Sequence, residues 1–336
     1  MLLPSPPSNA WRQMGLSAVS GRRRAHCVQM QALRSASRWS LKTMEHDIQN
    51  MIVQALYDRI LRAYRENKPF RVYIIMPLLP GFEGDAGSRV TGVSINYELL
   101  FIKQSLFHGP SALIPRLRTI LAQPENYISV CGLRTYDTWP DGRLATEFIY
   151  VHSKLMIVDD RKLIIGSANI NDRSMLGYRD SELALVAEDT AERSLVYWKV
   201  FVGEVARRFR KSLMAEHLGV LTKEAREAAD WNHNLLDDPV CNEFFHNVWC
   251  KFAESNMKIF DDVFAMVPSN NMESFDKVAE IRSVEPLYRR DPKKANELIA
   301  GLHGHLVRFP EDFLCKEDLT PPQLSKENAI GSIVWT

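Results

Sequence analysis

The chain has 336 residues, of which 46% are hydrophobic and 25% are charged, and its formal net charge is +1. This composition is typical of a folded globular protein with a sizeable core. The near-neutral charge argues against a protein that binds nucleic acid along its backbone, which requires a basic face. No apolar run approaches the length of a membrane span, so any contact with lipid is expected to be peripheral.

The cysteines predict a reducing compartment. They are odd in number and form no CxxC pair, which is typical of free thiols rather than a disulfide framework. We therefore expect a cytoplasmic protein. The five cysteines are Cys27, Cys131, Cys241, Cys250 and Cys315.

The N-terminal part of the chain differs from the remainder in its charged residues. The first 44 residues contain six arginines and no Asp or Glu, as a transit peptide does. Residues 1–26 are interpreted as a disordered N-terminal segment, whereas residues 31–40 (QALRSASRWS) are not counted as part of an added signal.

Helices and strands alternate through the first two thirds of the chain. Apolar residues at helical spacing predict a helix over residues 46–67, and a β-branched run predicts a buried strand over 72–76. A second helix is expected over 112–121 and a strand over 127–133. This alternation predicts an α/β protein.

Three further strands are predicted around the most informative part of the chain. They cover residues 147–158, 163–168 and 182–187, and the first two are joined by the turn Asp159-Asp160-Arg161-Lys162. The pattern then becomes helical over 190–221.

Four basic residues of this helical segment lie on or near one face, and they either meet phospholipid headgroups or form a solvated surface. They are Arg207, Arg208, Arg210 and Lys211. Beyond residue 237, aromatic residues at helical spacing predict a packed core. Residues 303–310 are expected to return to the sheet as a strand.

Five residues between 152 and 169 suggest a phosphate site: His152, Lys154, Asp159, Ser167 and Asn169. Residues two apart on a strand share a face, so His152 and Lys154 point the same way, as do Ser167 and Asn169. If the two strands pair, an imidazole, an ammonium, a hydroxyl and a carboxamide can converge. Such a group suits a phosphodiester, because a nucleophile lies beside donors for the non-bridging oxygens.

This spacing matches HxKxxxxD(x6)GSxN, the HKD motif, and so resembles the phospholipase D superfamily. The longer string YVHSKLMIVDDRKLIIGSANINDRSMLGYRDSELAL resembles the second HKD motif of eukaryotic phospholipases D. The stretches at 31–40, 71–85 and 237–249 and the terminal VWT agree with it. The chain therefore resembles the C-terminal catalytic half of an animal-type enzyme. The implied fold is a phospholipase D-like α-β-α sandwich half-domain at residues 27–220, followed by a mostly helical C-terminal region at 221–336 that returns to the catalytic sheet.

The resemblance implies a role for each residue of the motif. His152 would be one of two histidines, of which one attacks phosphorus and the other protonates the leaving alcohol. The second-motif histidine is usually the acid/base partner, although a neutral imidazole suits either role. Lys154 and Asn169 would hold the phosphoryl oxygens, with the Ser167 hydroxyl nearby. No metal or cofactor is expected.

Two carboxylates compete for a supporting role. The family uses a carboxylate near position 182 to accept the other N–H of the histidine, and Glu182 is preferred over Asp180. Asp159, the acidic residue of the motif, is interpreted as capping the turn or pairing with a cation, and thus as structural support.

The motif occurs once, because His152 alone among nine histidines has Lys two residues later. Three hypotheses follow. The chain forms a homodimer in which two copies of His152 face each other, as short single-motif bacterial members do. Alternatively, it is a truncated product that needs a second HKD-bearing half, or a catalytically silent chain that binds lipid or a full-length partner.

A second departure concerns the sheet. In eukaryotic phospholipases D a strand of the type YIENQFF precedes the RVYxxxPLLPGFEGD segment, and this chain has no such string. We expect the corresponding central position of the sheet to be empty or filled by other residues. An empty position would leave backbone groups unpaired, which is costly.

The leading hypothesis is a phosphoric diester hydrolase of the phospholipase D type. It would convert phosphatidylcholine to phosphatidic acid and choline through a phosphohistidine, as a peripheral protein on a cytosolic membrane surface. Its expected partners are the phospholipid substrate and a second HKD-bearing half or a homodimer, and no nucleic acid.

Overall fold

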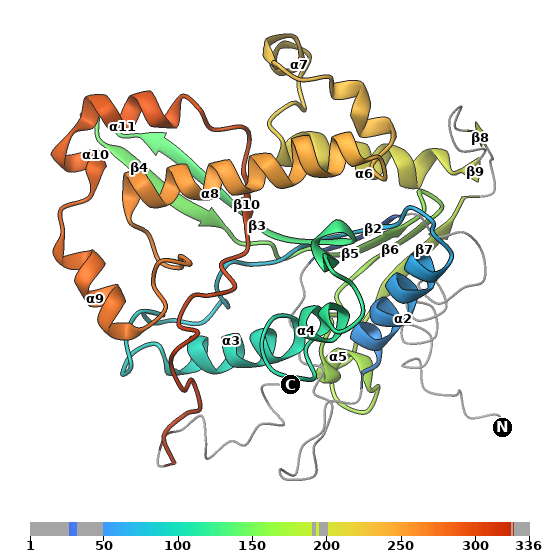
Figure 1. Cartoon of the computed structure of the whole chain (residues 1–336), viewed down its shortest axis with the longest axis horizontal. Helices are drawn as coiled ribbons and strands as arrows, with labels where there is room; N and C mark the ends of the chain where they lie inside the picture. The colour runs from blue at the N-terminus through green and yellow to red at the C-terminus, as the bar shows by residue number, and fades with distance from the viewer. Residues whose placement is uncertain (1–26, 32–49, 190–192, 195–200, 324, 326–336) are drawn as a thin grey trace.

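The computed structural model describes residues 27–31, 50–189, 193–194, 201–323 and 325 (Figure 1). The segment 1–26 that was predicted to be disordered lies outside the described residues, as do the QALRSASRWS stretch after Gln31 and the terminal VWT.

The strands are β1 (Cys27–Gln31), β2 (Arg71–Ile75), β3 (Ile128–Thr138), β4 (Leu144–Ile149), β5 (Lys154–Val158), β6 (Lys162–Gly166), β7 (Ala184–Glu188), β8 (Arg193–Ser194), β9 (Phe201–Val202) and β10 (Leu306–Arg308). The helices are α2 (Ile52–Arg65), α3 (Val93–Leu106), α4 (Leu113–Arg118), α5 (Asp172–Met175), α6 (Glu204–His217), α7 (Lys223–Ala228), α8 (Lys251–Phe264), α9 (Phe275–Ser283), α10 (Leu287–Arg290) and α11 (Pro292–Ile299). Short turns of other helix types are η1 (Pro124–Asn126), η2 (His233–Asp237) and η3 (Glu243–Cys250), the last a π-helix.

One mixed sheet organises the fold. Its strand order is β10-β3-β2-β1-β5-β6-β7, and β4 pairs with β3. Strands β1, β2 and β3 are parallel, whereas β5, β6 and β7 each run antiparallel to the strand before them in this order. Helices α2 to α5 cover one face and α6 covers the other (Figure 1). The predicted α/β sandwich is therefore confirmed.

Strand β1 fills the centre of the sheet. It pairs with β2 from Cys27↔Arg71 to Gln31↔Ile75, and with β5 from Val28↔Val158 to Gln31↔Leu155. The central position that a YIENQFF-type strand would take is therefore not empty. It is filled by other residues, which was the second of the two expectations. Because both edges of β1 are bonded, the neighbouring strands do not face an empty row of backbone donors and acceptors.

The core extends across both faces of the sheet and into the C-terminal region. The aromatic side chains predicted to pack are buried, and they are Phe244, Phe245, Trp249, Phe252, Phe260 and Phe264. Tyr73 of β2 lies against Trp249, with ring centroids 4.9 Å apart in an edge-to-face arrangement. Within the predicted strand 303–310, Leu306–Arg308 form β10, which returns to the sheet as predicted and pairs with β3. Both large hydrophobic clusters contain residues from before and after position 220, and the domain boundaries at 26 and 220 stay predictions.

The predicted helix over residues 190–221 is shorter than expected. Its described part begins at Glu204, and Phe201–Val202 form strand β9. The four basic residues do not form one solvent-facing row. Arg210 is fully buried, Arg207 and Lys211 both contact Asp237, and Arg208 pairs with Glu204.

The β5–β6 turn is fixed to α6 by a buried ion pair. Asp159 and Asp160 both have positive φ, at 57° and 54°, a conformation that Asp tolerates in tight hairpins. The Asp160 carboxylate accepts two hydrogen bonds from Arg210, at 2.6 Å from Nε and 2.8 Å from Nη2. Sequence patterning gave no sign of this pair, because its members are 50 positions apart.

We expect Arg210→Met to destabilise the protein by about 3–5 kcal/mol, since it leaves the Asp160 carboxylate buried and unpaired. Arg208→Met is the matched control on the same helix, because the Arg208 side chain is 76% exposed and its partner is Glu204. It should lower the free energy of unfolding by less than about 0.5 kcal/mol. Chemical denaturation measures both, and equal effects would contradict a structural role for the buried pair.

His217 at the end of α6 is buried and neutral. Burial, and to a smaller extent the charge of the neighbouring His305, together lower its pKa from 6.5 to about 4. Its Nδ1 has no hydrogen-bond partner among the described residues.

Unfolded His217 binds a proton near pH 6.5, whereas the folded side chain does so only near pH 4. The stability contributed by the neutral side chain is therefore complete above pH 6.5 and is lost as the pH falls towards 4. We expect the advantage of the wild type over His217→Gln to shrink by up to about 3 kcal/mol over this range. Denaturation curves at pH 7 and 4.5 measure it, and parallel curves would contradict it.

Candidate functional site

Three antiparallel strands place the motif residues at one edge of the sheet. Lys154 of β5 is paired with Gly166 of β6, and Gly166 is paired with Ala184 of β7. The segments next to these residues, 150–153, 167–171 and 180–183, therefore leave the sheet at the same edge. We call Lys154 and these three segments the site rim. The predicted pairing of the two motif strands is confirmed, and it brings His152, Ser167, Asn169 and Glu182 to this rim.

His152 lies in an irregular link and not on a strand. The predicted continuous strand 147–158 is wrong, because β4 ends at Ile149 and β5 begins at Lys154. The chain changes partners here, since β4 pairs with β3 whereas β5 pairs with β1 and β6. The His152 side chain is exposed, and its imidazole makes no hydrogen bond to a described residue. The centroid of its ring lies 6.1 Å from the centroid of the Tyr150 ring, and the two ring planes are inclined by 30°.

Lys154 places a positive charge beside this link. Its side chain is buried, and its Nζ donates a hydrogen bond to the backbone carbonyl of His152. The ammonium therefore holds the backbone that carries the imidazole. Such a buried cation at the rim is suited to attract an anionic group.

Ser167 and Glu182 are joined directly. The Ser167 hydroxyl donates to the Glu182 carboxylate, and the Leu183 backbone N–H donates to the Ser167 hydroxyl at 3.0 Å. The expected partner of Glu182 was His152, and within the described residues its partner is Ser167 instead. The rival carboxylate Asp180 is paired with Arg173 at 2.9 Å. The orienting role of Glu182 stays a prediction.

Asn169 is held by the short helix α5. Its backbone N–H donates to Ser174 Oγ at 3.1 Å, and its side-chain Oδ1 is buried without a hydrogen-bond partner among the described residues. Asn171 caps α5 by accepting a hydrogen bond from the Ser174 N–H at 3.0 Å. Sequence reasoning missed this cap, although Asn is one of the residues preferred at the N-terminus of a helix.

Asp172 is a second polar residue that sequence reasoning missed. One of its carboxylate oxygens accepts hydrogen bonds from the Asn50 backbone at 2.9 Å and from the Asn50 side chain at 2.8 Å. This contact attaches α5, and with it the Asn169 segment, to the residues that precede α2.

Asp159 does not belong to the rim. It follows the last residue of β5, about 15 Å along the strand from Lys154. Its charge acts on Arg59, whose pKa is lowered to about 10 mainly by burial and raised in part by Asp159. Asp159 is therefore removed from the candidate catalytic residues, as a correction of the sequence-based assignment. Its position agrees with the structural role that the sequence also suggested.

The loop at residues 78–85 (LLPGFEGD) reaches the rim through Tyr150. A Cβ on Gly81 would lie 2.8 Å from the Tyr150 hydroxyl oxygen, so the loop backbone and this ring are in close contact. Tyr150 in turn lies beside His152. The loop thus approaches the rim through one aromatic ring.

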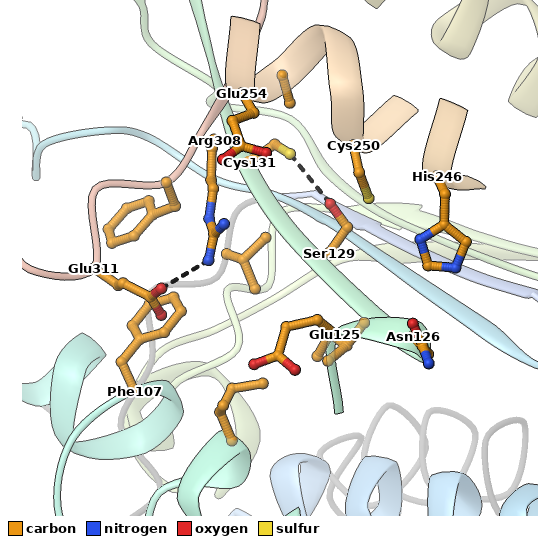
Figure 2. A pocket seen from close by; sticks show the side chains of 15 residues that line it. Phe107, Glu125, Asn126, Ser129, Cys131, His246, Cys250, Glu254, Arg308 and Glu311 are labelled. Atoms are coloured by element: carbon orange, nitrogen blue, oxygen red, sulfur yellow. Dashed lines mark hydrogen bonds and ion pairs between the residues drawn. The ribbon is translucent and has the colours of Figure 1, made fainter. Parts of the chain in front are cut away.

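A separate cavity of about 230 Å³ lies beside β3 (Figure 2). In Figure 2 the Arg308 side chain enters it and donates to Glu311 at 2.8 Å. Burial raises the pKa of the Cys131 thiol to about 12 and that of Cys250 to about 11, so both are protonated at neutral pH. We assign no chemistry to this cavity, because its arginine is already paired and its thiols are not nucleophilic.

No group of three or more His, Cys, Asp or Glu side chains among the described residues could hold a metal ion. Nor is any helix in this part of the chain long and apolar enough to cross a membrane.

Comparison with known proteins decides the family. The family model described as phospholipase D matches residues 138–258. Phospholipase D2 of Bos taurus is 39% identical over 369 positions that cover 100% of this chain and 38% of the relative. Phospholipase D1 of Homo sapiens is 40% identical over 290 positions that cover 85% of this chain and 26% of the relative.

The chain belongs to the phospholipase D superfamily. It spans between about a quarter and two fifths of the length of these relatives. The alignment to the bovine enzyme has more positions than this chain has residues, so the relative contains residues that this chain lacks. Among solved structures, NucT from Helicobacter pylori superposes with a TM-score of 0.30 and 16% identity, covering 55% of this chain and 80% of NucT.

The exposure of the phospholipase D motif histidine gives a test that needs no substrate. We expect diethyl pyrocarbonate to modify His152 at least about tenfold faster than His217, because the first imidazole is exposed and the second is buried. Peptide mass spectrometry of one sample compares the two, and the denatured chain is the control in which both should react alike. Equal protection of both histidines in the folded chain would contradict the placement of His152 at the rim.

Proposed function

We propose that this chain provides a phospholipase D-type phosphodiesterase site that cleaves phosphatidylcholine to phosphatidic acid and choline. It would act as a peripheral protein on a cytosolic membrane surface. The observation that supports the proposal is the shared rim, where the strand register brings an exposed imidazole, a buried ammonium and an amide to one edge. The names of the relatives support the same class of reaction.

The proposed reaction has two steps through a phosphohistidine. In the first, an imidazole nitrogen bonds to phosphorus, the P–O bond to choline breaks, and a second imidazole donates a proton to the choline oxygen. In the second, that imidazole takes a proton from water, whose oxygen displaces the histidine and gives phosphatidic acid. A small primary alcohol can replace water in this step. Lys154 and Asn169 would stabilise the negative charge on the phosphoryl oxygens, and Ser167 would stay tied to Glu182.

The proposed site needs a second histidine, which this sequence does not supply in a second HKD motif. We therefore propose that a second HKD-bearing half faces the rim, in a homodimer or in a separate partner. The exposed imidazole of His152 is suited to such an arrangement, because no described residue occupies its nitrogen atoms.

We expect the purified chain to transfer the phosphatidyl group of phosphatidylcholine to ethanol, and His152→Ala to reduce this by at least about a thousandfold. His233→Ala is the matched control, because His233 lies on η2 and outside the rim. Chromatography of the phosphatidylethanol product measures both. A folded wild-type chain without transfer activity would favour the silent-chain hypothesis.

A mixing experiment tests whether two copies share one site. If each site needs two copies of His152, an equal mixture of wild type and His152→Ala that has been dissociated and reassociated should retain about a quarter of the wild-type activity. If each chain works alone, or with a different partner, about half should remain. Light scattering on the same samples checks that the chains associate.

A further inference from the structure

The β3–β4 hairpin extends beyond the edge of the sheet that carries the site rim. Cys131 of β3 and Leu155 of β5 lie on one row of the sheet, through Ile75 of β2 and Gln31 of β1. From this row β3 continues in the direction of the rim to Thr138, which is about 20 Å further. Beyond Arg134 its described strand partner is β4 (Figure 1). The same strand β4 then leads to His152 three residues after its end.

One face of this hairpin rests on the C-terminal helical region. Arg134 is buried over the ring of Phe260 of α8, 5.7 Å from its centroid, and its Nη2 donates to the Val267 carbonyl at 3.4 Å. Leu144, near the tip, is 4% exposed and belongs to the main core. One face of the hairpin is therefore packed against the rest of the protein, and its opposite face is open.

The open face is hollowed and combines an aromatic ring with carboxylates. Thr135, Asp137 and Ala145 line a shallow hollow of about 630 Å³ together with Trp139 and Glu147. Trp139 is 59% exposed, although Trp is among the costliest side chains to leave in water. Asp137 and Glu147 are exposed on neighbouring strands.

We propose that the open face of the β3–β4 hairpin docks the protein on membranes rich in choline headgroups. Trp139 would enter the headgroup layer, and Asp137 and Glu147 would face the trimethylammonium groups. This inference rests on the proposed action on a phospholipid, and it adds the surface that holds the rim against the bilayer.

Charge decides which membrane this surface prefers. An indole ring is stable at the membrane interface and attracts a quaternary ammonium through its π face. The exposed part of the hairpin carries Asp137, Asp141 and Glu147, and Arg143 as a compensating cation, bound to Asp141. An acidic surface is repelled by anionic lipid. The hairpin therefore selects a zwitterionic membrane over an anionic one.

Vesicle co-flotation with the full chain tests the docking surface. Trp139→Ala should weaken binding to pure phosphatidylcholine vesicles by about fivefold or more. The double variant Asp137→Asn, Glu147→Gln should weaken binding to the same vesicles by about twofold or more, and strengthen binding to vesicles with one fifth phosphatidylserine.

Tyr64→Ala is the matched control, because Tyr64 is a 47% exposed aromatic residue on α2, which leads to the start of β2 at the opposite edge of the sheet. It should bind as the wild type does. The proposal would be overturned if Trp139→Ala bound phosphatidylcholine vesicles as tightly as the wild type does. It would also be overturned if the double variant changed binding to the same extent on phosphatidylcholine vesicles and on vesicles with phosphatidylserine. His152→Ala should also bind as the wild type does, so a failure of catalysis and a failure of docking are distinguished.

Discussion

The pairing of β5 with β6 is the constraint on which the rest of the site depends. A turn of two aspartates in the left-handed conformation sets the register, and the buried contact of Asp160 with Arg210 fixes that turn to α6. With the register set at one end of the hairpin, Lys154 and Gly166 must lie opposite each other at the other end. A slip by one residue would exchange the two faces of both strands and separate the ammonium from the motif's amide.

The sheet also depends on what lies beside β5. In this chain β1 occupies the central position, with β2 on one side and β5 on the other. This arrangement joins the parallel and antiparallel parts of the sheet into one unit. It also keeps the row from Cys131 to Leu155 continuous, so that the β3–β4 hairpin and the site rim project from the same edge.

The rim itself combines rigid and free groups. Lys154, Ser167 and Asn169 are each held by a hydrogen bond to a neighbouring backbone or side chain, whereas the imidazole of His152 is exposed and makes none within the described residues. Fixed donors beside a free imidazole are the arrangement that charge stabilisation requires.

The sequence alone determined the family, the alternation of strands and helices, and the motif residues, because these depend on local spacing and on periodicity. It also predicted that the motif strands pair and that the aromatic C-terminal residues are buried. Only the tertiary structure decided that His152 lies between strands, that Asp159 is remote from the rim, and that Arg210 is buried against Asp160. Each of these depends on which distant segment becomes the neighbour of a strand, and local sequence does not encode that choice.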